Sequence, residues 1–218
     1  MIKMVQKNLD LPACEQSLLA LEAFLSSNLE IEETGAGGLQ EFFENHPDLL
    51  LLMGDCFFPS LSPHYYGKEF SILGEFRADF AISDKSQSKF LFVEFESAKT
   101  DSVFVTKYDG KTITSYDWSP RFEHGFSQVV DWQYRMDDLG RTSRLEEHFG
   151  SAKVDHEGIL VVGRDHFVKK AGCLSRLAWR KEKVVINSKR VHCLTFDGLL
   201  IELRGRYDAI SEVLAGNL

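Results

Sequence analysis

The sequence is poor in the features that mark secreted, zinc-binding and membrane proteins. Only four of its 218 residues are cysteines, widely spaced and without a CxxC pair: Cys14, Cys56, Cys173 and Cys193. This spacing argues against a disulfide framework or a zinc site, so we expect reduced, mostly buried thiols in a cytoplasmic protein. The longest apolar run, Leu49 to Met53, is far too short to span a membrane. Residues 1–7 lack the apolar segment of a signal peptide.

Several catalytic signatures are also missing. The sequence contains no Walker-type phosphate loop, no GxGxxG fingerprint and no GxSxG nucleophile elbow. The glycine-rich stretch at residues 34–38 neither follows a predicted strand nor carries the lysine of a phosphate loop, so we interpret it as a flexible connection. These absences disfavour a small-molecule enzyme of those classes.

Charge is distributed unevenly along the chain. The net charge of −8 argues against binding to nucleic acid, because an acidic protein repels phosphate. However, residues 1–60 carry a net charge of −8, whereas residues 164–190 carry +7. Such a division allows one face to bind a polyanion. The candidates for nucleic-acid binding are Lys169, Lys170, Arg176, Arg180 and Lys181; a solvated helix face is the alternative interpretation for each.

Hydrophobic periodicity predicts an α/β fold with helices covering a mixed sheet. Helical spacing of Leu18, Leu21, Phe24, Leu25 and Leu29 predicts a helix over 13–29. Further helices are expected over 39–45, 120–139 and 169–183 and after residue 198. Strands are expected over 70–82, 90–96, 158–163 and 190–196, and residues 97–118 are expected to be irregular. The helix at 120 is predicted from Ser119-Pro120, an N-cap residue followed by proline at the first helical position.

Three carboxylates are expected to meet on one face of a β-hairpin. A polar break at residues 84–88 separates two β runs, which is typical of a hairpin. Pairing about Ser86 places Asp79 opposite Val93 or Glu94, and a slip of one residue would send Asp79 to the other face. Glu94 and Glu96 are two residues apart on one strand, so they share a face.

Convergence of like charges on a half-buried sheet is costly unless a cation compensates for them. Mg²⁺ prefers carboxylate oxygens and keeps water in its remaining positions, and a metal-bound water is a good nucleophile. The spacing therefore makes Asp79, Glu94 and Glu96 candidate metal ligands. The alternative interpretation is that these strand-end acids simply point into solvent.

The order of these motifs resembles that of the PD-(D/E)XK nuclease superfamily, in which a hairpin supplies Asp and then (D/E)-x-K to one metal site. The chain is most similar to the nuclease domain of the Shedu anti-phage defence proteins. The stretches that carry the resemblance are residues 39–50, 77–80, 93–96, 124–132, 159–163 and 194–200. No single motif is specific, but together they cover most of the chain. The resemblance implies a restriction-endonuclease-like core in which a mixed β-sheet is flanked by helices.

The resemblance also implies roles for individual residues. Asp79, Glu94 and Glu96 would bind Mg²⁺, for which Mn²⁺ can substitute, and Gln128 matches a helix glutamine that often joins the active centre. For Trp132, core packing is the preferred interpretation. His124 is interpreted as either a catalytic residue or the start of a helix.

The sequence departs from the family pattern at two places. Glu96 replaces the usual lysine, and Lys99 is the nearest cation along the chain. Gly37 stands where the first helix of the core usually carries a glutamate, for which Glu33, Glu41 or Glu44 could substitute.

We therefore expect a cytoplasmic, Mg²⁺-dependent endonuclease that cleaves DNA in anti-phage defence. Residues 1–38 are expected to form an N-terminal helical segment and residues 39–218 the nuclease-like domain. A homo-oligomer is expected, since nucleases that cut both strands often need two active centres. The alternative is a degenerate nuclease fold that binds nucleic acid or protein, which the two departures favour.

Overall fold

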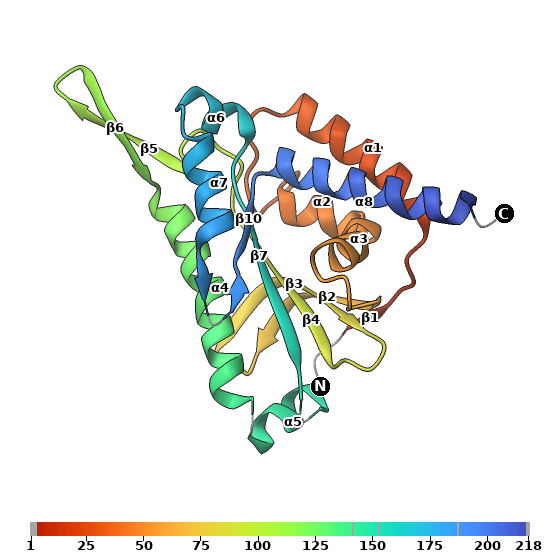
Figure 1. Cartoon of the computed structure of the whole chain (residues 1–218). Coiled ribbons are helices and arrows are strands. Elements are labelled where there is room, and N and C mark those ends of the chain that lie inside the picture. The colour runs from red at the N-terminus through yellow and green to blue at the C-terminus, as the bar shows by residue number, and fades with distance from the viewer. Residues whose placement is uncertain (1–3, 141, 152, 187, 217–218) are drawn as a thin grey trace.

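A six-stranded mixed sheet forms the centre of the computed structural model, which describes residues 4–140, 142–151, 153–186 and 188–216. In spatial order its strands are β1 (Val5–Gln6), β2 (Pro63–Ile72), β3 (Phe76–Asp84), β4 (Lys89–Phe95), β7 (Asp155–Val161) and β10 (His192–Leu194). Neighbours from β1 to β4 pair antiparallel, whereas β7 pairs parallel with β4 and β10. Helices lie against both faces (Figure 1), which confirms the predicted α/β fold class.

One face of the sheet is covered by four helices that form an apolar layer. They are α1 (Leu11–Ser27), α2 (Leu39–Asn45), α3 (Pro47–Phe57) and α8 (Phe196–Gly216). Their side chains pack on Phe80, Val93, Phe95 and Ile159 in one continuous core. Arg164 ties this layer to the sheet, since its guanidinium binds the Asp197 carboxylate and the backbone carbonyls of Leu25 and Asn28.

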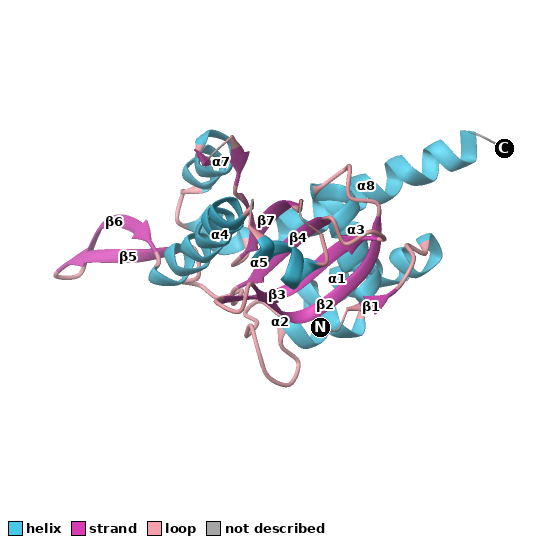
Figure 2. Ribbon diagram, turned by 90° about the horizontal axis from the view of Figure 1, so that it is seen from below, coloured by secondary structure: helices cyan, strands magenta, loops and turns pink. Residues whose placement is uncertain are grey.

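The other face carries α4 (Pro120–Leu139), α5 (Ser143–Phe149), α6 (Asp165–Lys170) and α7 (Leu174–Lys183). Phe92 and Leu160 of the sheet pack here against Phe122, Val129 and Trp132. Trp132 is only 1% exposed, which confirms that it is a core residue. Figure 2 shows α4 and α7 next to each other on this side.

Two short β-hairpins lie outside the main sheet. The larger, β5 (Phe104–Asp109) and β6 (Thr112–Trp118), projects away from the body of the molecule (Figures 1 and 2). The smaller consists of β8 (Val185–Ile186) and β9 (Lys189–Arg190). The prediction that residues 97–118 are irregular was wrong for the larger hairpin, whereas residues 97–103 belong to no helix or strand, as predicted. Most of this larger hairpin is exposed on both sides, so its sequence lacks the alternation that one buried face imposes.

Several predicted helix limits need correction. The basic region is not one helix but two, because Gly172 adopts φ +66° between α6 and α7. Helix α1 ends at Ser27, so Leu29 lies outside it and is 54% exposed. The apolar run at Leu49 belongs to α3, which was not predicted as a helix. The limits of α2 and α4 were correct, and the Ser119 hydroxyl caps α4 by accepting from the Phe122 N–H.

All four cysteines are free, and three of them are buried. Among the described residues, no helix is both long and apolar enough to cross a membrane.

Candidate functional site

The predicted hairpin brings the carboxyl groups together where β3 begins and β4 ends. Phe80 pairs with Val93 and Ala81 with Phe92, and one further step in this register would place Asp79 opposite Glu94. Glu96 directly follows β4 on the same face. Glu94 and Glu96 are only 7% and 4% exposed, so these acids do not point freely into solvent.

Asp79 is held in place from both sides of the hairpin end. Its Oδ2 accepts a hydrogen bond from the Phe95 backbone N–H at 2.7 Å. Its Oδ1 accepts from the Gln40 side-chain amide of α2 at 2.6 Å. These bonds fix the carboxylate orientation and leave one lone pair on each oxygen for a further partner.

Glu33 is the fourth carboxyl at this site and comes from the loop before α2. Ile31 and Ala98 form a two-way backbone bridge, which carries this loop alongside the end of β4. The Glu33 carboxyl then lines the same pocket as that of Glu96, close enough for each to shift the pKa of the other. Of the three glutamates considered for this role, Glu41 instead accepts from the Gly37 N–H and Glu44 pairs with Lys68.

Helix α4 closes the site with a row of polar side chains at helical spacing. Arg121, His124 and Gln128 line an open pocket of about 540 Å³ together with Glu33, Glu94, Glu96 and Pro120, and we refer to it as the acidic pocket. Gly125 allows α4 to lie close to Leu160 and Glu96. A Cβ there would lie 2.6 Å from Leu160 Cδ1 and 3.2 Å from Glu96 Cγ.

Arg121 supplies positive charge where the usual lysine is missing. Its guanidinium lies 3.0 Å from the Glu96 carboxylate and 3.6 Å from Glu33. Lys99 does not take this role, because its ammonium group pairs with Glu32. The cation therefore comes from the first turn of α4 rather than from strand β4.

The carboxyls of the acidic pocket and the neighbouring Asp79 have raised pKa values, and burial is the largest cause in each. The pKa of Glu94 rises to about 10, with added repulsion from Asp79 and Glu96. The pKa of Asp79 rises to about 7, although the Phe95 N–H opposes the shift. The pKa of Glu33 rises to about 7, helped by Glu96. Burial also raises the pKa of Glu96, while Arg121 limits the rise. The site therefore holds more carboxyl groups than its cation can keep ionised.

The donors fit a hard divalent cation in kind. Carboxylate oxygens from Asp79, Glu94 and Glu96 are what Mg²⁺ prefers. The buried Oε1 of Gln128 has no hydrogen-bond partner in the described part of the chain, so it is an oxygen available to such a site. Within the described ranges, no three His, Cys, Asp or Glu side chains already surround one point as a formed metal site would. Side-chain rotation would therefore have to accompany metal binding.

The predicted nucleic-acid-binding residues lie apart from the acidic pocket, on α6 and α7. Most of them already have partners within the protein. Lys169 pairs with Asp165 and Lys181 with Glu202, while Arg180 makes two hydrogen bonds to Glu123. Arg176 donates to the Tyr116 carbonyl, and Lys170 lines a hollow beside the β5–β6 hairpin.

Residues 38–200 match the family model described as Shedu protein SduA, C-terminal, which covers more than half of the chain. No curated protein sequence matches the chain.

Proposed function

The chain belongs to the Shedu family, since residues 38–200 match the model of the SduA C-terminal region. We propose that it is a metal-dependent endonuclease acting on DNA. Family membership points to anti-phage defence. Hydrolysis of phosphodiester bonds, its metal dependence and the DNA substrate are the parts that we add.

The observation that carries the proposal is the crowding of carboxyl groups in and beside the acidic pocket. Four carboxyl groups converge against the charge of Arg121. Burial raises the pKa of each, and repulsion by neighbouring carboxylates adds to the rise at Glu33, Asp79 and Glu94. A structural cluster of this kind is destabilising, so its presence favours a functional role. Asp79, Glu94 and Glu96 would hold Mg²⁺ or Mn²⁺. When bound, such an ion supplies an activated water and stabilises charge on a phosphate oxygen.

The protein's own groups have distinct roles in this scheme. Arg121 points its guanidinium into the pocket and would stabilise negative charge on the phosphate. Glu33, beside Glu96, would accept a proton from the attacking water, since a carboxyl with a pKa near 7 is suited to general-base catalysis. Gln128 would orient that water or the phosphate through its unpartnered Oε1.

A catalytically degenerate binding module is the second candidate. It is favoured by one observation, the ion pair between Glu96 and Arg121. This pair occupies the position of the usual lysine and would have to open for Arg121 to reach a phosphate.

Plasmid and single-stranded DNA cleavage with Mg²⁺ or Mn²⁺ tests the proposal, comparing the native protein with Glu94→Gln. Gln preserves shape while removing charge. Glu157→Gln is the matched control, since Glu157 is a half-buried strand carboxyl outside the pocket. We expect metal-dependent cleavage by the native and control proteins, and its loss in Glu94→Gln. Absence of cleavage by all three, with DNA binding intact, would favour the degenerate module. Equal cleavage by all three would place the active centre elsewhere.

A further inference from the structure

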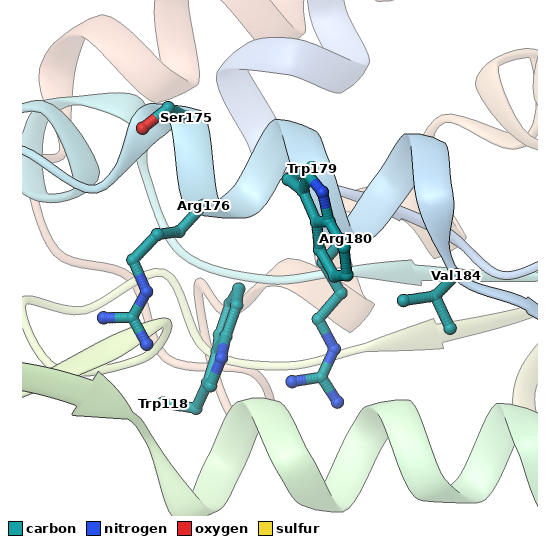
Figure 3. Close-up of a pocket in the computed structure, with 6 residues that line it drawn as sticks. All are labelled: Trp118, Ser175, Arg176, Trp179, Arg180 and Val184. Carbon is teal, nitrogen blue, oxygen red and sulfur yellow. The ribbon is translucent and has the colours of Figure 1, made fainter.

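We infer that a second pocket, between α7 and the start of α4, binds an unpaired base of a single-stranded nucleic-acid segment. This inference rests on the proposed function, because it gives the acidic pocket a neighbouring site that holds the strand. The residues that line the second pocket are Trp118, Ser175, Arg176, Trp179, Arg180 and Val184 (Figure 3), and we refer to it as the aromatic pocket. Its volume of about 600 Å³ is within the usual range for small-ligand sites.

Trp118 is a fixed platform on one side of this pocket. Its ring lies 4.5 Å from those of Phe104 and Phe122, measured between centroids. It also stands between the guanidinium groups of Arg176 and Arg180, as Figure 3 shows, at 5.3 and 4.7 Å. Packing on several sides holds the ring, so little conformational entropy would be lost when a flat ligand binds.

Trp179 is the exposed partner of that platform. It projects from α7 with 61% of its surface accessible, an unusual state for the largest apolar side chain. A base that entered the pocket would cover this ring, and every base has a face that can stack on an aromatic side chain. An exposed tryptophan next to a fixed one is therefore suited to stacking without sequence preference.

The charge of the pocket favours a nucleic acid over an apolar ligand. Arg180 is neutralised by Glu123, whereas Arg176 contacts the Tyr116 carbonyl and has no ion-pair partner among the residues that the structure describes. Lys183 extends the basic surface in the last turn of α7. A cation beside stacking rings is the arrangement that single-strand binding proteins use.

A second hollow continues the surface along the β5–β6 hairpin. It has a volume of about 530 Å³, and its lining includes Phe104, Tyr108, Tyr116 and Lys170. Arg176 joins the two hollows, since it lies over both the Phe104 and Trp118 rings. Tyr108 is 63% exposed near the tip of the hairpin. The aromatic surface thus extends beyond the length of one base. It is therefore suited to a nucleic-acid strand rather than to a free nucleotide.

The aromatic pocket lies across α4 from the acidic pocket. Arg121 and His124 of this helix line the acidic pocket, whereas Phe122, Glu123 and Phe126 contact Arg180 on the other side. A helix with its side chains is about 10–12 Å wide. One strand can therefore reach both pockets within a few nucleotides. A paired duplex would not fill the aromatic pocket, because its bases are already stacked.

The test is binding of a labelled oligo-dT to the full chain in EDTA, so that cleavage plays no part. We expect Trp179→Ala to weaken binding about 5- to 150-fold, the effect of losing one stacked base, and Trp179→Phe to restore most of it. Tyr134→Ala is the matched control, since Tyr134 is an equally exposed aromatic side chain (65%) on α4 outside the pocket. Arg176→Gln should lower the slope of log affinity against log salt by about 0.7.

Binding of oligo-U and of a blunt DNA duplex tests whether the pocket takes a base from DNA, from RNA or from a paired strand. Equal dependence on Trp179 for oligo-dT and oligo-U supports stacking, and dependence for oligo-dT alone supports a DNA-selective pocket. Unchanged oligo-dT binding in Trp179→Ala overturns the inference, and if the native protein still cleaves with Mg²⁺ the proposed function survives. Equal weakening for the blunt duplex also overturns it. If Trp179→Ala loses oligo-dT binding but the native protein never cleaves DNA, the aromatic pocket is supported and the nuclease proposal is refuted.

Discussion

The two sides of α4 differ in how well their ionisable side chains are paired. On the acidic side, Glu33, Glu94 and Glu96 are crowded together with Arg121 as their nearest cation. On the aromatic side, Arg180 is bonded to both carboxylate oxygens of Glu123 and covered by three rings. One helix therefore separates a region of crowded carboxyl groups that cannot all ionise from a region where the charge of Arg180 has a partner.

This difference indicates which side of α4 lowers the stability of the folded state. Buried like charges destabilise the folded state, so the acidic side is retained for what it can bind or catalyse. On the aromatic side, the Arg180–Glu123 pair stabilises the junction of α4 and α7. The unsatisfied feature there is the exposed Trp179 ring rather than a charge.

The largest expected effect is on catalysis through Arg121. We predict that Arg121→Ala lowers the rate of metal-dependent cleavage by about 10²–10³-fold, as for loss of one group that stabilises transition-state charge. Arg121→Lys should recover most of this loss, because a lysine is what the family pattern has near this site. The measurement is single-turnover plasmid cleavage at saturating metal.

Arg135→Ala is the control for Arg121, since Arg135 lies on the same helix and pairs with Glu75 and Asp138 away from the pocket. It should cleave at nearly the native rate. Native cleavage by Arg121→Ala would mean that the cation of the acidic pocket is not used, and the contrast between the two sides of α4 would lose its functional meaning.

The second prediction concerns the close approach of α4 to the acidic side. Gly125→Ala should lower the free energy of unfolding by about 1–3 kcal/mol, because the new Cβ would overlap the buried Leu160 side chain. Gly205→Ala, in the exposed interior of α8, meets nothing within 4 Å and should raise it by about 0.5–1 kcal/mol. Urea denaturation measures both, and equal effects would refute the tight packing at Gly125.

The elements that build the acidic side could largely be predicted from sequence. Alternating residues around a short polar loop fixed the β3–β4 hairpin, and Ser119-Pro120 marked the start of α4. Both signals are local, so they can be detected without knowledge of the tertiary structure. Asp79, Glu94 and Gln128 were found in this way or through the family resemblance.

The remaining parts depend on contacts between distant segments. Glu33 reaches the site through the bridge of Ile31 to Ala98, across 67 positions of sequence, and no periodicity marks it. Arg121 was not singled out, because a cation at the first turn of a helix has no pattern that ties it to a strand. The aromatic pocket was missed for the same reason, since β6 and α7 supply its two tryptophans from positions 118 and 179.

The third prediction is a pH dependence that distinguishes the acidic side. The folded-state pKa of Glu94 is raised to about 10, so folded Glu94 keeps its proton from pH 7 to 8.5 while the unfolded chain has lost it. The folded state then binds more protons, and its stability falls as the pH rises, by up to about 1 kcal/mol per pH unit. Urea denaturation in EDTA at several pH values in this range measures the slope.

Glu94→Gln should flatten this slope, and addition of Mg²⁺ to the native protein should reverse it, because a bound cation favours the ionised carboxyl. His156 does not interfere. Burial lowers its pKa to about 4, so its contribution to stability is lost only as the pH falls below about 6.5. If the slope of stability against pH were equal in the native protein and in Glu94→Gln, the pKa of Glu94 would not be raised in the folded state.

The smallest effect is expected on the satisfied side of α4. Glu123→Gln leaves one acceptor oxygen for Arg180 and removes only a half-exposed charge, so it should cost less than about 1 kcal/mol. Arg180→Ala also removes the packing over Trp118, Phe122 and Phe126 and should cost about 1–2 kcal/mol. Thermal denaturation of both variants measures the difference. A Glu123→Gln loss as large as that of Arg180→Ala would mean that charge, rather than stacking, joins α4 to α7, and that the two sides of the helix are more alike than their geometry indicates.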